Sequence, residues 1–156
     1  MLKINGKEYD LKFGYTFADR LTKDYSTDEA EGFRRLIGQI VDGDPKALVA
    51  GYRFALDVPT KSLPSAREVA EALEADGIFA KGDEAFKDLF KEMQKCGFFK
   101  MNLNFYLSSV KSQVKSAKEA LSAITNKDDK QAAQVSLKQA EAMEKEMKDR
   151  LKKLEA

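Results

Sequence analysis

The stretch after Gly97 contains no proline and no glycine, and it is rich in Ala, Lys and Glu. Apolar residues recur along it at alternating spacings of four and three, which is the heptad pattern of a coiled coil. The first run is Leu103, Leu107, Val110, Val114, Ala117, Leu121 and Ile124. A slightly less regular run follows: Ala133, Leu137, Ala140, Met143, Met147, Leu151 and Leu154. This C-terminal part of the chain can therefore form little except long amphipathic helices.

A polar interruption, "TNKDD", separates the two runs. Asn126 or Asp128 could cap a second helix there, because short polar side chains accept the free amide hydrogens of a helix start. Two helices of similar length around a short polar turn predict a helical hairpin, a long αα-hairpin or coiled-coil arm over residues 98–156. One continuous helix is the alternative.

The N-terminal segment "INGKEYDLKF" carries a different pattern. Asn5-Gly6 between alternating apolar residues predicts a β-hairpin with a type I′ turn, which needs positive φ at both central residues. The expected pairs are Ile4 with Lys7, Lys3 with Glu8 and Leu2 with Tyr9. One face then holds Leu2, Ile4, Tyr9, Leu11 and Phe13. An isolated hairpin is marginally stable in water, so we expect this one to pack on helices.

Helix signals fill the chain between the hairpin and Gly97. Caps are expected at Thr16, at Ser26 and Asp28, at Asp44 before Pro45, and at Ser65 with Glu68 as a capping box. The expected helices cover about 16–25, 26–43, 44–56, 65–77 and 83–96. The fold class is therefore mainly α (α+β): an N-terminal β-hairpin packed on a helical domain of residues 1–97, followed by the arm of residues 98–156.

Composition excludes several classes of protein. The chain has 156 residues, of which 43% are hydrophobic and 34% charged, as in soluble helix-rich proteins. A net charge of +1 gives no electrostatic case for nucleic acid or membrane. No apolar run approaches the roughly 18 residues of a membrane span. We expect no signal peptide. The single cysteine, Cys96, excludes an internal disulfide and fits a reducing cytoplasm.

The search for chemistry finds no catalytic, cofactor or metal site, so we do not expect an enzyme. The chain has no histidine, which removes the commonest general base and a common metal ligand. "GIFAKGDE" has the two glycines of a phosphate loop, but Asp83-Glu84 stands where Lys-Ser/Thr is required. A basic surface for nucleic acid could be formed by Arg34-Arg35, Lys95, Lys100 and the lysines 111, 115 and 118. A solvated helical face explains them as well, and we do not expect nucleic-acid binding.

Partner binding is the remaining possibility. Aromatic and methionine side chains crowd the start of the arm, more than one helical seam can cover, and two more methionines lie further along it. The partner-binding candidates are Phe98, Phe99, Met101, Phe105, Tyr106, Met143 and Met147. Core packing where the arm begins is one interpretation of the first five. A groove for a partner helix is the other.

About residues 1–100 also resemble the tail assembly chaperones of long-tailed phages and prophages of Gram-positive bacteria. The opening "MLKINGKEYDLKFGYTFADRL" has the order strand, "NGK" turn, strand ending in "LKFG", and helix. "GDPKALVAGYRFAL", "LPSAREVAEALEADG" and "DEAFKDLFKEMQKCGFF" follow in the layout of that family. The two long helices after residue 100 carry no motif of the resemblance.

The resemblance implies a non-enzymatic protein in the cytoplasm of the bacterial host, not secreted and absent from the mature virion. It implies two partners, the tape-measure protein and the tail tube protein, and no cofactor. An adaptor that oligomerises through a coiled-coil arm is the alternative, and a small nucleic-acid-binding regulator is a weaker one. The unpaired edge of the hairpin and the apolar seam of the arm both predict a homo-oligomer.

Overall fold

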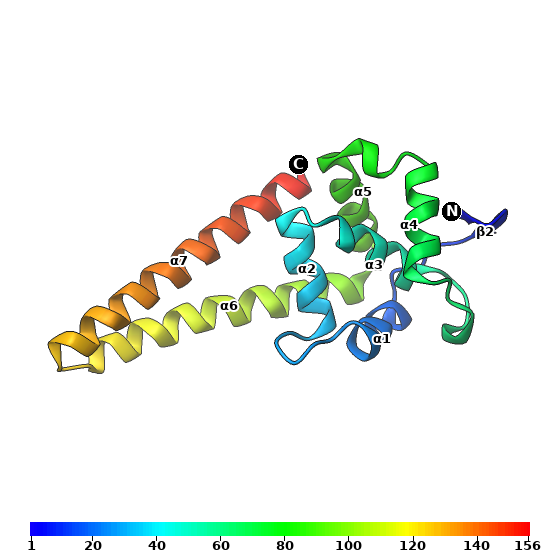
Figure 1. The fold of residues 1–156 in the computed structure, drawn as a ribbon. Helices are drawn as coiled ribbons and strands as arrows, with labels where there is room; N and C mark the ends of the chain where they lie inside the picture. The colour runs from blue at the N-terminus through cyan, green and yellow to red at the C-terminus, as the bar shows by residue number, and fades with distance from the viewer. The chain divides into compact units, whose positions relative to one another are not determined.

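The computed structural model describes all of residues 1–156 and is mainly α-helical, as predicted (Figure 1). Two strands open the chain, β1 (Leu2–Ile4) and β2 (Lys7–Tyr9). The helices are α1 (Tyr15–Asp24), α2 (Gly32–Asp42), α3 (Pro45–Ala55), α4 (Ala66–Ala75), α5 (Asp83–Gln94), α6 (Gly97–Ala123) and α7 (Lys127–Glu155), with 3₁₀ turns at Thr60–Ser62 and Phe79–Lys81. Two compact units result: Met1–Lys100 with Leu154–Ala156, and Met101–Lys153.

The N-terminal hairpin has the predicted register and turn. Leu2 pairs with Tyr9, Lys3 with Glu8 and Ile4 with Lys7. The φ angles of Asn5 and Gly6 are 50° and 79°, as a type I′ turn requires. Leu2 and Ile4 are buried, whereas Lys3 between them is exposed. The alternation of the sequence therefore sets which face of β1 meets the helices.

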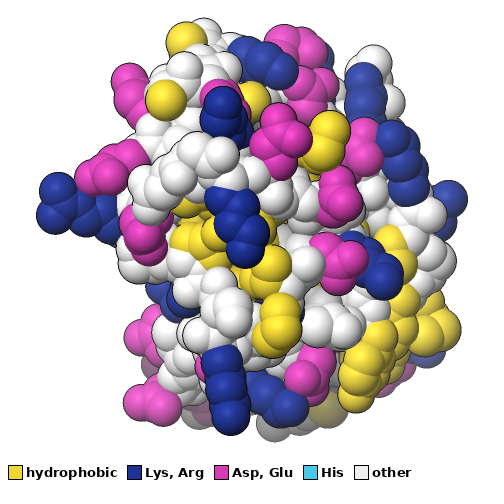
Figure 2. All heavy atoms as spheres, turned by 90° about the vertical axis from the view of Figure 1, so that its right-hand side faces the viewer, with side chains coloured by type: hydrophobic (Ala, Val, Ile, Leu, Met, Phe, Trp, Pro, Cys, Tyr) yellow, Lys and Arg dark blue, Asp and Glu magenta, His cyan; other side chains and the backbone are white.

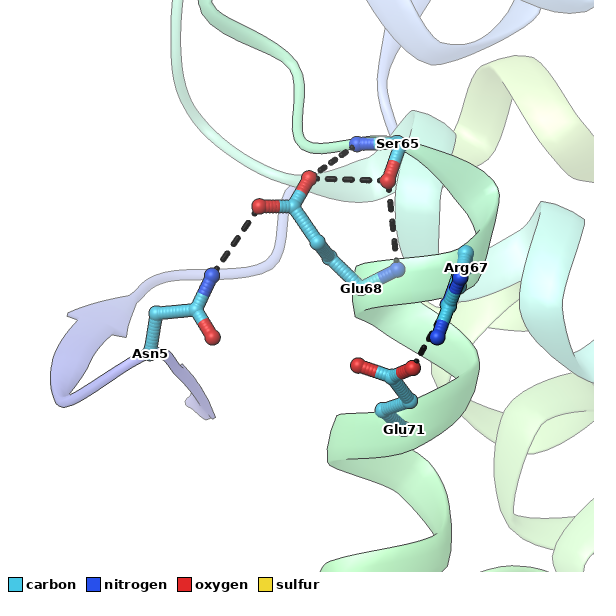
Figure 3. Close-up of polar contacts among 5 residues, drawn as sticks. All are labelled: Asn5, Ser65, Arg67, Glu68 and Glu71. Atoms are coloured by element: carbon cyan, nitrogen blue, oxygen red, sulfur yellow. Dashed lines mark hydrogen bonds and ion pairs between the residues drawn. The ribbon is translucent and has the colours of Figure 1, made fainter.

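Two further contacts hold the hairpin on the first unit. The Asn5 side-chain amide donates to the Glu68 carboxylate at 3.0 Å, at the N-terminus of α4 (Figure 3). Past β2, the extended chain pairs with the segment after α3: the Lys12 amide donates to the Ala55 carbonyl at 2.7 Å, and the Asp57 amide to the Asp10 carbonyl at 2.9 Å. The hairpin is thus fastened at its turn and at its exit, as the marginal stability of a lone hairpin requires.

Substituting Gly6 tests the turn. Nothing lies within 4 Å of a Cβ built at Gly6, so the cost of Gly6→Val is backbone strain alone. An L-residue in this left-handed conformation costs about 1–2 kcal/mol, so we expect the melting temperature to fall by several degrees. Gly6→Asn should cost less, because asparagine tolerates positive φ. Equal melting temperatures for wild type and Gly6→Val would contradict the turn.

Of the four capping signals before Gly97, two predicted a helix start correctly and two incorrectly. The Asp44 carboxylate accepts from the Lys46 amide with Pro45 at the first helical position, and Ser65 and Glu68 form the expected capping box (Figure 3). The start of α5 at Asp83, predicted from apolar periodicity and not from a cap, is also confirmed. Thr16 is not a cap, because α1 begins at Tyr15 after Gly14.

The predicted caps at Ser26 and Asp28 were wrong as well. α2 begins only at Gly32, and Glu31 is its N-cap, with a carboxylate that accepts from the Arg34 amide. Residues 26–31 form a loop, in which the Thr27 amide donates to the Ala30 carbonyl at 2.9 Å. The Ser26 hydroxyl still accepts a hydrogen bond from a backbone amide at the start of α2, that of Gly32, at 2.8 Å. The two residues are six positions apart, whereas an N-cap side chain bonds an amide two or three positions ahead.

The core of the first unit lies among α1 to α5. Its fully buried side chains include Phe17, Leu21, Leu36, Ile37, Ile40, Leu48, Leu73, Leu89 and Phe90. α3 contacts α2, α4 and α5, so it is the central helix of the unit. A Cβ at Gly51 of α3 would lie 2.7 Å from a methyl group of Leu89, which shows how closely α5 approaches α3.

In the second unit, α6 and α7 are two helices, so one continuous helix was the wrong alternative. Residues 124–126 join them, and Asn126 caps α7 by accepting from the Asp128 amide at 2.9 Å. Lys118 of α6 pairs with Glu141 of α7 at 2.8 Å, which places the two helices side by side as a hairpin. Figure 1 shows them running antiparallel from this connection.

The apolar seam of α7 is more regular than the sequence analysis proposed. Met143 is 70% exposed, so its assignment to the seam was wrong. Glu144 has only 14% of its side chain exposed, and its carboxylate pairs with Lys148. Position 144 continues the spacing from Ala140 to Met147 as four and three, which 143 does not. A charged residue therefore occupies an inward position on α7.

Candidate partner-binding surface

The seven candidate residues separate into a buried, a half-buried and an exposed group. Phe99 is 2% exposed and packs on Phe33 and Phe90, with ring centroids 5.5 and 5.8 Å apart, so it belongs to the core of the first unit. Phe98, Tyr106 and Met147 are half-buried. Met101, Phe105 and Met143 are 63%, 69% and 70% exposed. Core packing thus accounts for Phe99, and the exposed group remains for a partner.

Tyr15 is an exposed aromatic residue that the sequence analysis missed. It begins α1, is 69% exposed, and meets Phe98 edge-to-face with ring centroids 5.6 Å apart. The cluster "FGYTF" was a visible signal, but Phe13 and Phe17 of the same cluster are buried. Which of these three rings points outward depends on the residue at which α1 begins, and the sequence did not predict that residue correctly.

Met101 and Phe105 lie one turn apart on α6, on the face turned away from its apolar seam. The seam passes through Leu103 and Leu107, so 101 and 105 fall at outer positions of the heptad. Continuing the same spacing of four and three gives Ser108, Ser112 and Lys115. We call these five residues the outer stripe of α6: two large apolar side chains, two small polar ones and a lysine.

An open groove of about 630 Å³ adjoins the middle of this outer stripe. It is lined by Ser108, Ser112, Val114 and the lysines 111, 115 and 118 of α6, and by Glu144 of α7. Glu141 accepts a hydrogen bond from Lys118 and raises the pKa of that ammonium group. Lys115 lies 3.9 Å from Glu119, and Lys111 makes no ion pair. The α6 side of the groove is therefore positively charged, with Lys118 already paired with α7, whereas Glu144 of α7, paired with Lys148, places one carboxylate on the opposite side.

The second unit as a whole also carries more basic than acidic residues. Residues 101–153 hold eleven Lys and Arg against seven Asp and Glu, and residues 101–123 of α6 hold one acidic residue, Glu119. Figure 2 shows the face on the right-hand side of Figure 1, where basic and acidic side chains are intermixed around patches of hydrophobic ones. No extended field of one sign covers that face.

A buried arginine gave no signal in the sequence. Arg20 is 5% exposed and has no carboxylate partner. Its guanidinium donates to the carbonyls of Phe54 at 3.0 Å, Leu56 at 2.8 Å and Val58, and to the Thr60 hydroxyl at 3.2 Å. These acceptors belong to the chain that leaves α3. Arg20 therefore fixes the exit of α3 on α1, which is a structural role.

Other groups give no sign of chemistry. No cluster of three or more Asp, Glu or Cys side chains is arranged to hold a metal ion. None of the helices has the length and apolarity to cross a membrane. Burial raises the pKa of Tyr25 and Tyr52, and the hydrogen bonds from the Ser65 backbone and side chain lower the pKa of Glu68. Each of these shifts arises from packing or capping.

Comparison with known proteins gives one family. The family model described as phage tail assembly chaperone protein, TAC, matches residues 1–105. No curated protein and no solved structure matches this chain. The matched range covers the hairpin, α1 to α5 and the beginning of α6, and it ends at Phe105.

Proposed function

The chain belongs to the phage tail assembly chaperone family, and from this membership we propose that it binds the tape-measure protein and helps to recruit tail tube subunits during tail assembly. The family match supports a role in tail assembly and a non-enzymatic one. The choice of these two partners is the proposal.

The observation that carries the proposal is the family match together with exposed apolar side chains on a long helix. A chaperone that keeps an apolar chain soluble needs exposed apolar surface on a body that is itself soluble. Met101 and Phe105 provide such surface at the end of the matched range. Methionine suits this use because its flexible side chain adapts to different partners. We propose that the protein acts in the cytoplasm of the bacterial host and leaves before the virion is complete.

Copurification tests the proposal. The full chain with an affinity tag is expressed together with the tape-measure protein of the same phage or prophage, and then with the tail tube protein. We expect the tape-measure protein to copurify, and the tube protein to join when all three are present. An oligomer that captures neither tail protein would favour the adaptor alternative and contradict the proposal.

We also propose that the chain forms a homo-oligomer, with the edge of β1 as one contact. In the observed register the backbone N–H and C=O of Lys3 point away from β2, so they are free to pair with another chain. We expect light scattering at tens of micromolar to give a mass above the monomer, and Lys3→Pro to reduce it by removing the outward N–H. A monomer for the wild-type chain would refute the oligomer. An unchanged oligomer for Lys3→Pro would move the contact to the arm.

A further inference from the structure

The outer stripe of α6 has the residue pattern of a helix-docking face. Met101 and Phe105 are more than 60% exposed, although both are large apolar side chains. Ser108 and Ser112 follow at the same heptad spacing, and their small side chains leave room for a second helix to approach closely. The groove of about 630 Å³ begins at these serines. Apolar anchors and a shallow groove thus lie along one line of the helix.

The charges along this line favour an acidic occupant. Lysines 111, 115 and 118 line the groove against a single lining carboxylate, that of Glu144 on α7, which is paired with Lys148. A positive rim steers an acidic partner toward the groove and disfavours a basic one. The second unit is itself basic, with eleven Lys and Arg against seven Asp and Glu, so its own surface is a poor occupant for this groove.

We propose that the outer stripe of α6 docks an amphipathic α-helix of the partner, whose apolar side chains cover Met101 and Phe105 and whose acidic side chains face Lys111 and Lys115. The partner helix follows the helix-in-groove mode, with anchors spaced three and four residues apart. That a tail protein supplies this helix rests on the proposed function. The location of the docking surface and the acidic character of the docked helix go beyond the proposed function.

A synthetic peptide tests the surface without any tail protein. The peptide has about six helical turns, with leucines at the a and d positions and glutamates beside them. A second peptide carries lysine in place of every glutamate. Fluorescence anisotropy with the full chain should show that the glutamate peptide binds and the lysine peptide does not. Binding should weaken as salt rises, because the lysine–glutamate pairs are exposed.

Matched variants locate the binding. Phe105→Ser removes an exposed ring, so the fold should be kept, and we expect binding of the glutamate peptide to weaken about tenfold. Val135→Ser on α7 also removes an exposed apolar side chain, at 52% exposure, and should change nothing. Lys111→Glu with Lys115→Glu should abolish binding of the glutamate peptide and permit the lysine peptide. Lys138→Glu, an exposed lysine of α7, is the charge control.

The outcomes separate the surface from the proposed function. Peptide binding that is absent, or equal in Phe105→Ser and Val135→Ser, overturns the docking surface. A change in oligomer mass with Phe105→Ser shows that a second copy occupies the stripe, which also overturns it. If the peptides behave as expected and the tape-measure protein is not captured, the proposed function fails and the surface stands. If the Phe105→Ser variant captures the tape-measure protein as well as wild type does, the docking surface is refuted and the proposed function stands.

Discussion

Arg20→Met is expected to lower the free energy of unfolding by about 3–5 kcal/mol, because it removes the donor of several buried hydrogen bonds. Methionine fills much of the same volume, so little cavity is created. The backbone carbonyls of Phe54, Leu56 and Val58 would each lose a hydrogen bond from the Arg20 guanidinium. Urea unfolding followed by circular dichroism gives the value.

Arg67→Met is the matched control for Arg20→Met. The Arg67 side chain is 87% exposed and pairs with Glu71 at 2.8 Å on the surface of α4 (Figure 3). An exposed pair of this kind contributes about 0–1 kcal/mol, so the control should be close to wild type. Equal losses for the two variants would mean that Arg20 does not hold the exit of α3.

Gly32→Ala should be the second strongly destabilising change. A Cβ at Gly32 would lie 1.8 Å from the Leu21 carbonyl oxygen and 2.5 Å from its carbon, both backbone atoms of α1. Since neither can move without displacing α1 or α2, we expect a loss of about 3 kcal/mol or more. Denaturant unfolding and the melting temperature both report it.

Gly38→Ala in the same helix gives the opposite sign. Gly38 has nothing within 4 Å of its Cβ position, and alanine favours a helix over glycine by about 1 kcal/mol. We therefore expect Gly38→Ala to be neutral or stabilising. If Gly32→Ala were equally benign, the close contact between the start of α2 and α1 would be wrong.

Local patterns predicted those parts of the fold that local physics decides. Asn5-Gly6 implies its turn because few other residue pairs adopt positive φ twice, and the register of β1 and β2 follows from the turn. Asp44-Pro45 and the Ser65–Glu68 capping box are equally local. In each case the interacting groups lie within a few residues, so the sequence shows both partners together.

The errors arose where tertiary contacts decide. Ser26 is a good capping residue by type, but α2 begins six residues later, where Gly32 meets α1 closely. Arg20 gave no signal because its acceptors are backbone carbonyls more than thirty positions away. Met143 was preferred to Glu144 as an inward residue on hydrophobicity alone, although the heptad spacing favours 144.

The candidate surface was predicted in composition and only partly in position. The crowding of aromatic residues at the start of the arm was visible, but it could not separate Phe99, which is in the core, from Phe105, which is exposed. Once the start of α6 is known, the positions of Phe99 and Phe105 around the helix axis show which of the two faces the core. The lysines at 111, 115 and 118 were noted as a basic or a solvated face, and the groove beside them became apparent only with α6 and α7 in place.

The proposed chaperone function is tested by the soluble fraction of the tape-measure protein. That protein is expressed alone, with the full chain, and with the Arg67→Met variant as a folded surface control, and the supernatant is quantified after centrifugation. We expect the tape-measure protein to be mostly insoluble alone and mostly soluble with either form of the chain. An equal soluble fraction with and without the chain would contradict the proposed function.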